Sequence, residues 1–335
     1  MGQNNSLYEY LAVSLRKPLE SWFLKGEKLQ EIRLRIGQPL MIRYDGEEFF
    51  LTEQGHGYRV WELEEEKRKK VFYITEEQMQ ETLSYLSDYS LYAYEEEIKQ
   101  GFFTVGGGCR IGVCGKAVVE NGEVKTIYPV SSLNIRFAHE IKGCSDRILP
   151  FLFKGERFLS TLIVSPPLCG KTTILRDCIR NLSNGGSYER EKKPHYFHGK
   201  TVGVVDERGE ISDFFCGMAQ HDLGIQTDVL SQCPKVEGMM MLIRTMAPEI
   251  IAVDEIGSEE EMNTMIYGMN CGCSLLATAH SASMEELLKK KAFQKVKEEK
   301  MFERYVILSR RNGVGTIEKV YDGDGQEIWE SKERK

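Results

Sequence analysis

The hydrophobic pattern predicts two domains that meet near residue 150. Residues 31–51 alternate apolar and polar positions, which is the period of a half-buried strand. Residues 75–101 open with the spacing of a capping box and continue at helical period. Residues 102–127 read as two or three strands that are joined by glycine turns. We therefore predict an α+β first domain, residues 1–150, that contains an antiparallel sheet.

Beyond residue 150 the pattern changes to an alternation of strand and helix. Such an alternation predicts a mainly parallel sheet with helices on both faces, over residues 151–335. A polar stretch, residues 184–200, interrupts it and is expected to be an ordinary loop, with His195 and His198 not forming a metal site. The segments that alternate are 161–164, 172–182, 201–205, 239–245, 250–253, 262–269 and 274–278.

Composition narrows the class of protein. A formal net charge of −7 over 335 residues argues against a protein whose main task is to coat nucleic acid. The nine cysteines form no paired C-x-x-C spacing, so we expect reduced cysteines and an intracellular chain. We find no apolar stretch of the roughly 18 to 20 residues that a membrane helix needs. We therefore expect a cytoplasmic protein without a transmembrane segment of its own.

A phosphate-binding loop is the strongest chemical signal in the chain. The apolar run 161–164 breaks into a turn that ends in Gly170-Lys171-Thr172, and a helical pattern follows. Strand, loop and helix in this order are the context that a Walker A motif requires. The lysine then reaches the β- and γ-phosphates, and the threonine hydroxyl binds Mg²⁺. The expected nucleotide-binding residues are Ser165, Pro166, Pro167, Leu168, Cys169, Gly170, Lys171, Thr172 and Thr173.

The loop departs from the usual pattern at its first position, where Ser165 replaces glycine. Serine is poor at positive φ, so this corner should have an ordinary backbone conformation. Pro166 and Pro167 lack N–H groups, so the backbone donors to phosphate should begin at Leu168. The alternative is an apolar strand that a chance Gly-Lys-Thr follows.

A second motif lies downstream. The apolar run 250–253 predicts a strand buried on both faces, and Asp254 and Glu255 follow it directly. Adjacent carboxylates cannot both enter the core, so they belong at the strand end, where open α/β sheets bind ligands. We assign Asp254 to Mg²⁺, partly through water, and Glu255 to polarising the attacking water. The alternative is a pair of solvated strand-end acids. Together the motifs predict a P-loop NTPase (RecA-like) domain that binds ATP and Mg²⁺.

Longer segments resemble one family closely. Residues 204–211, 227–257 and 304–317, with 31–40, 106–118 and 131–141 in the first domain, are similar to stage III sporulation protein AA of endospore-forming bacteria. The resemblance covers about residues 7–325. That family in turn resembles the traffic ATPases of type II and type IV secretion. It implies an ATPase, hexameric like those enzymes, on the mother-cell side of a channel complex, held peripherally at the membrane by partner proteins.

The resemblance also implies roles for residues at two further strand ends. An acidic box of the secretion ATPases corresponds to Asp206 and Glu207, which would organise Mg²⁺ and water. A histidine box corresponds to His280, which would contact the γ-phosphate or orient water. The alternatives are an internal ion pair between Glu207 and Arg208, and a histidine whose hydrogen bonds are merely structural.

Phosphoryl transfer usually needs an arginine besides the loop lysine. Arg110 and Arg136 lie in stretches similar to the arginine-bearing strands of secretion ATPases, which would make the site lie between the two domains. Arg244 is the less favoured candidate, because it is expected within a strand ahead of Pro248.

Three functional classes stay open. A secretion-type motor ATPase is favoured. A motor on nucleic acid would need a basic groove lined with aromatic residues, and the dense basic runs, 289–300 and Lys332 to Lys335, are interleaved with acids or terminal. A nucleotide-gated scaffold with little hydrolysis is kept open by Ser165. We expect no nucleic-acid partner.

Overall fold

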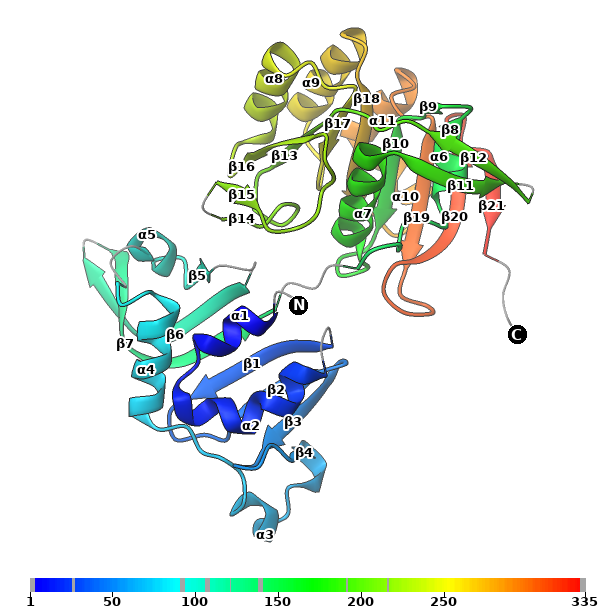
Figure 1. The fold of residues 1–335 in the computed structure, drawn as a ribbon. Helices are drawn as coiled ribbons and strands as arrows, with labels where there is room; N and C mark the ends of the chain where they lie inside the picture. The colour runs from blue at the N-terminus through cyan, green and yellow to red at the C-terminus, as the bar shows by residue number, and fades with distance from the viewer. Residues whose placement is uncertain are drawn as a thin grey trace. The chain divides into compact units, whose positions relative to one another are not determined.

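The chain forms two compact units, Met1–His139 and Glu140–Lys335. The computed structural model describes residues 4–25, 28–90, 94–105, 109–120, 122–137, 141–190, 192–215 and 217–331 (Figure 1). The basic tail Lys332 to Lys335 lies outside the described residues. The second unit begins about ten residues before the expected boundary at 150, because Ile148 and Leu149 are already buried in its core.

The first unit is built on an antiparallel sheet, as the sequence predicted. Its strand order is β4-β3-β2-β1-β7-β6-β5, and each neighbouring pair runs antiparallel. The strands are β1 (Leu29–Arg35), β2 (Met41–Tyr44), β3 (Glu47–Leu51), β4 (Gly57–Arg59), β5 (Phe102–Val105), β6 (Cys109–Glu120) and β7 (Glu123–Arg136).

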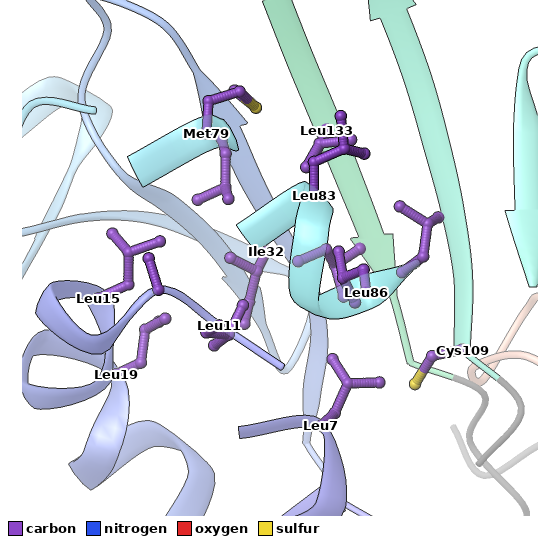
Figure 2. Packing of buried hydrophobic residues seen from close by; sticks show 14 of the residues in the cluster. Leu7, Leu11, Leu15, Leu19, Ile32, Met79, Leu83, Leu86, Cys109 and Leu133 are labelled. Atoms are coloured by element: carbon purple, nitrogen blue, oxygen red, sulfur yellow. The ribbon is translucent and has the colours of Figure 1, made fainter. Parts of the chain in front are cut away.

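Helices of the first unit bury their apolar sides against this sheet. Figure 2 shows Leu15 and Leu19 of α2 and Leu83 of α4 in one cluster with Ile32 of β1 and Leu133 of β7. The predicted capping box opens α4, where the side chains of residues 75 and 78 bond each other's backbone N–H. The helices are α1 (Asn4–Glu9), α2 (Val13–Leu24), α3 (Glu65–Arg68), α4 (Glu76–Leu86) and α5 (Glu95–Ile98), with a 3₁₀ turn, η1 (Val60–Glu62).

The second unit contains a sheet of order β16-β13-β17-β18-β10-β19-β20-β21. The strands from β16 to β19 are parallel, and β20 and β21 continue the sheet antiparallel. The strands of this sheet are β10 (Thr161–Ser165), β13 (Val202–Asp206), β16 (Thr227–Ser231), β17 (Ile250–Val253), β18 (Ser274–His280), β19 (Arg304–Ser309), β20 (Thr316–Asp322) and β21 (Glu327–Glu330). Three two-stranded pieces complete the unit: β8 (Phe153–Lys154) with β9 (Arg157–Phe158), β11 (Gly186–Arg190) with β12 (Lys193–Phe197), and β14 (Phe214–Phe215) with β15 (Met218–Ala219).

Both faces of the parallel sheet are covered. In β10, Ile163 packs in one core with Ile174 of α7, whereas Leu162 and Val164 pack in the other with residues of α8 and α9. Since neighbouring residues of a strand point to opposite faces, the sheet lies between two helical layers. The predicted α/β fold is confirmed. The helices are α6 (Leu149–Leu152), α7 (Lys171–Asn184), α8 (Lys235–Thr245), α9 (Glu259–Asn270), α10 (Met284–Lys289) and α11 (Lys291–Glu298).

Two local expectations were wrong. Residues 184–200 are not a plain loop but contain the hairpin β11–β12, whose Tyr188 and Phe197 are buried and lie with ring centroids 5.5 and 4.4 Å from that of Phe153. His195 stacks on Tyr188 across this hairpin. Arg244 is not in a strand but in the last turn of α8, a helix that buries residues 239, 242 and 243 at helical spacing. Over the residues that the structure covers, no helix has the length and apolar character to cross a membrane.

Candidate nucleotide site

The phosphate loop lies between β10 and α7, at the carboxyl ends of the parallel strands. Ser165 is fully buried and pairs with His280 of β18, and its φ is not positive, as predicted. The left-handed positions are instead Leu168, with φ 60°, and Gly170, with φ 84°. A Cβ atom on Gly170 would lie 2.9 Å from Val314 Cγ1, so a side chain at this position would force its neighbours to shift. The tight, glycine-dependent turn that ends in α7 therefore fits a phosphate-binding loop.

Lys171 turns its buried side chain toward the end of β18. Its Nζ lies 3.0 Å from His280 Nδ1 and 3.4 Å from the Pro166 carbonyl oxygen. Burial lowers the pKa of Lys171, although the nearby carboxylates of Asp254 and Glu255 oppose this shift. The loop thus holds a cation in a partly desolvated place, where its attraction to phosphate is stronger than in water.

Thr172 and Asp254 meet as a pair. The Thr172 hydroxyl donates to Asp254 Oδ2 at 2.6 Å, and the Thr278 hydroxyl donates to Asp254 Oδ1. In P-loop proteins, Mg²⁺ is bound by a hydroxyl in the first helical turn after the phosphate loop and by a carboxylate at the end of a neighbouring strand. The residues present therefore fit the metal that the sequence predicted.

Glu255 is held from several sides. Its Oε1 lies 2.6 Å from His280 Nε2, and its Oε2 accepts from Arg208 Nη1 at 2.6 Å. Because the Lys171 ammonium can only donate, His280 Nδ1 accepts, and the imidazole proton is then on Nε2 and donates to Glu255. Burial opposes ionisation of Glu255, but the hydrogen bond from His280 and the charges of Arg208 and Lys171 outweigh it and lower the pKa. The carboxylate is therefore ionised and oriented.

The acidic pair after β13 separates into two different environments. Both oxygens of Asp206 accept hydrogen bonds from its own loop, from the backbone N–H of Ile211 and the N–H and hydroxyl of Ser212, at 2.6 to 3.1 Å. This buried carboxylate closes the loop, and the geometry gives no support to the Mg²⁺ role expected of it. Glu207 is half-exposed, and its carboxylate pairs with Lys235, whose Nζ lies 3.5 Å from Glu207 Oε2.

Lys235 was missed by sequence reasoning. Its Nζ donates to the Glu255 carbonyl oxygen at 2.7 Å and lies 3.2 Å from Glu261 Oε1 and 3.5 Å from Glu207 Oε2. The one sequence signal is a lysine at the first position of a helix, where the helix dipole disfavours a cation.

Arg110 and Arg136 lie in the first unit. They are cross-strand partners on β6 and β7, and they line a hollow of about 530 Å³ together with Arg33 and Arg35 of β1. The Arg110 guanidinium stacks on Phe102, 3.5 Å from the ring centroid. The structure therefore groups four arginines on this sheet, and it brings Lys171, Thr172, Asp254, Glu255 and His280 together in the second unit.

The fold has similar solved structures. It is similar to the ATPase DotB of Yersinia pseudotuberculosis, with a TM-score of 0.57 and 10% identity over 93% of this chain and 80% of that chain. It is also similar to the pilus retraction motor PilT solved with bound ADP, with a TM-score of 0.54 and 15% identity over 87% of this chain and 77% of that one. At such low identity these likenesses concern the fold alone, a P-loop α/β fold that the chain shares with secretion and pilus ATPases.

The sequence places the chain more narrowly. The chain belongs to the family described as sporulation stage III, protein AA, whose model matches residues 1–328. It is 37% identical to the stage III sporulation protein AA of Bacillus subtilis over 326 residues, and this match covers 96% of each of the two chains. The family resemblance seen in the sequence is thereby confirmed.

Proposed function

We propose that the protein binds ATP with Mg²⁺ and hydrolyses it, as a motor or assembly ATPase of a secretion-like channel complex used during endospore formation. The family supports the sporulation role, and the secretion-type ATPase fold supports the class of activity. The observation that carries hydrolysis is the series of contacts from Lys171 through His280 to the ionised Glu255.

Each part of the site then has a task. The loop backbone from Leu168 onward and Lys171 hold the β- and γ-phosphates. Thr172 and Asp254 would hold Mg²⁺, which neutralises phosphate charge when it is bound. Glu255 accepts a hydrogen bond from the attacking water and orients it toward the γ-phosphate, and His280 fixes the Glu255 carboxylate through Nε2.

The experiment is a steady-state phosphate-release assay on the wild type and Glu255→Gln, with and without membrane proteins of the channel complex. The amide keeps the shape of the side chain and loses its charge, so ATP should stay bound while turnover falls by about 10²- to 10⁴-fold. Hydrolysis by Glu255→Gln at the wild-type rate would move the base elsewhere, with Glu207 next in line.

The proposal extends to assembly and place. By resemblance to the secretion ATPases, we propose a homo-oligomeric, hexameric ring. We place it in the cytoplasm on the mother-cell side, held at the membrane by channel proteins. Sedimentation of the purified chain with and without ATP tests the ring, and fluorescence imaging in sporulating cells that lack the channel proteins tests the membrane association.

The alternative of a nucleotide-gated scaffold with little hydrolysis is decided by the same phosphate-release assay. It rested on Ser165, but that residue lies in β10 with an ordinary strand backbone, where glycine has no advantage. For a motor on nucleic acid, the basic run after α10 would have to be available. Two cations of this run already have partners, because Lys290 donates to the His280 carbonyl and Lys291 pairs with Glu259 at 3.3 Å.

A further inference from the structure

Lys235 is a largely buried cation of the site to which the proposed function gives no task. It begins α8 and lines a small cleft at the ends of β13 and β17, together with Glu207, Arg208, Asp254 and Glu255. Its side chain is only 10% exposed. An ammonium group is costly to bury unless several acceptors surround it, and here a carbonyl oxygen and two carboxylates do so.

The helix does not explain this residue. The first turn of a helix carries the positive end of the dipole, so a lysine there is disfavoured. Glu261, in contrast, is the favoured acid of the capping box that opens α9, and its carboxylate also accepts from the backbone of Gly257 and Ser258. Lys235 is therefore kept in place by acceptors on the segment after β17 and on its neighbours.

The shortest of these contacts, at 2.7 Å, is to a residue with an unusual backbone conformation. Glu255 has φ 52°, a left-handed conformation that a glutamate adopts rarely. Its N–H donates to Thr278 Oγ1 at 2.9 Å, and its carbonyl oxygen accepts from Lys235 Nζ at 2.7 Å. The peptide groups on both sides of the Glu255 Cα atom are thus fixed, and such strain persists at sites where the surroundings enforce it.

The backbone conformation decides where the carboxylate points. With both flanking peptide groups held, the Glu255 side chain leaves the Cα atom toward His280 and Arg208, whose nitrogens lie 2.6 Å from its two oxygens. A relaxed, negative φ would turn the Cα–Cβ bond and move the carboxylate away from these partners.

We propose that Lys235 is a positioning residue for hydrolysis, which holds the Glu255 carbonyl and so maintains the backbone that aims the Glu255 carboxylate. This inference rests on the proposed function, in which Glu255 orients the attacking water. Among the contacts described for Lys235, none involves the phosphate loop, so its effect should fall on the chemical step rather than on nucleotide binding.

The test compares Lys235→Met with a matched lysine. Methionine keeps the length of the side chain and removes the charge and the donor. Lys200 pairs with Glu249 at 2.9 Å, next to the first residues of β13 and β17 and thus at the opposite ends of the same strands, so Lys200→Met removes a similar ion pair away from the site. Lys235→Met should lower kcat about 10- to 100-fold, because small misplacements of catalytic groups have effects of that size. The KM for ATP should stay within about twofold, and Lys200→Met should leave kcat unchanged.

A purely structural lysine would behave differently. If Lys235 were structural, Lys235→Met would lower the thermal stability and leave kcat intact in the folded fraction, and that result would overturn the proposal. Lys235→Arg retains the cation and a donor, so it should recover a large part of the lost kcat. If Lys235→Met does not fold, Lys235→Leu, which also lacks the charge and the donor, takes its place with the same expectation.

A crystal structure of the variant separates this inference from the proposed function. It should show Glu255 with negative φ and its carboxylate no longer hydrogen-bonded to His280. If the wild type does not hydrolyse ATP but the variant relaxes in this way, the proposed function fails, whereas the inference that Lys235 holds the Glu255 backbone stands. If Glu255 keeps its left-handed backbone without Lys235, the positioning role fails whatever the activity.

Discussion

Gly170→Ala should destabilise the phosphate loop, and the structure gives the size of the effect. Gly170 has φ 84°, and the left-handed conformation costs a residue with a Cβ atom about 1–2 kcal/mol. The added carbon would lie 2.9 Å from Val314 Cγ1 and 3.2 Å from the backbone nitrogen of Gly315. Overpacking of this kind costs about 1–3 kcal/mol. The sum is about 2–5 kcal/mol, which for a unit of this size lowers Tm by on the order of 10 °C.

Calorimetry on the wild type and the variant measures this shift, and a second substitution divides it into its causes. Val314 is mostly exposed, so Val314→Ala alone should change stability by less than about 0.5 kcal/mol. In the double variant, the contact with Cγ1 is removed while the backbone strain stays, so part of the loss should return. A Gly170→Ala protein with the wild-type Tm and the wild-type ATP affinity would refute the reasoning.

Three further changes test individual residues of the site. Lys171→Ala should weaken ATP binding severely, because this lysine is the cation of the phosphate loop, and an unchanged affinity in a fluorescent-nucleotide titration would contradict the site. The pKa of Glu255 is lowered, so hydrolysis should persist below the ordinary glutamate range and be lost as the pH falls through the lowered pKa. Because Arg208 contributes to that lowering, Arg208→Ala should move the acid limb of the kcat profile to higher pH, and an unmoved limb would show that its charge is not felt. Whichever of Arg110 and Arg136 serves hydrolysis should lose on the order of 10³-fold in kcat on substitution by alanine, with ATP binding retained, whereas wild-type rates in both variants would remove the role.

The central strands and the phosphate loop could be predicted because their signals are local. β10 and β17 are short apolar runs buried on both faces, and such runs need no knowledge of their partners. The chemistry follows from where the runs end, since parallel strands present their carboxyl ends at one edge. This is why Asp254 and His280, 26 positions apart in the sequence, could be expected near the same loop.

The parts that sequence reasoning missed depend on contacts between distant segments. The hairpin β11–β12 is mostly polar, and it is held by Tyr188 and Phe197 against Phe153 of another segment. The boundary between the units also depends on a distant contact. Asp177 of α7 accepts hydrogen bonds from the backbone of Gly143 and Ser145, and these bonds attach residues before 150 to the second unit.

The tasks of charged residues were the least predictable. Asp206 and Asp254 both follow apolar strands and look alike in the sequence, yet one is bonded to its own loop and the other to the Thr172 hydroxyl. Only the arrangement of the loop after β13 separates them. The role of Lys235 could not be predicted from the sequence, because its acceptors come from three separate segments.

The measurement that tests the account most directly is ATP binding and phosphate release by the wild type, Glu255→Gln and Asp254→Ala, side by side. We predict that the wild type hydrolyses ATP, that Glu255→Gln binds ATP with Mg²⁺ and does not turn it over, and that Asp254→Ala loses Mg²⁺-dependent binding. Equal phosphate release by the wild type and Glu255→Gln would contradict the central claim that the Glu255 carboxylate, held by His280 and Arg208, orients the attacking water.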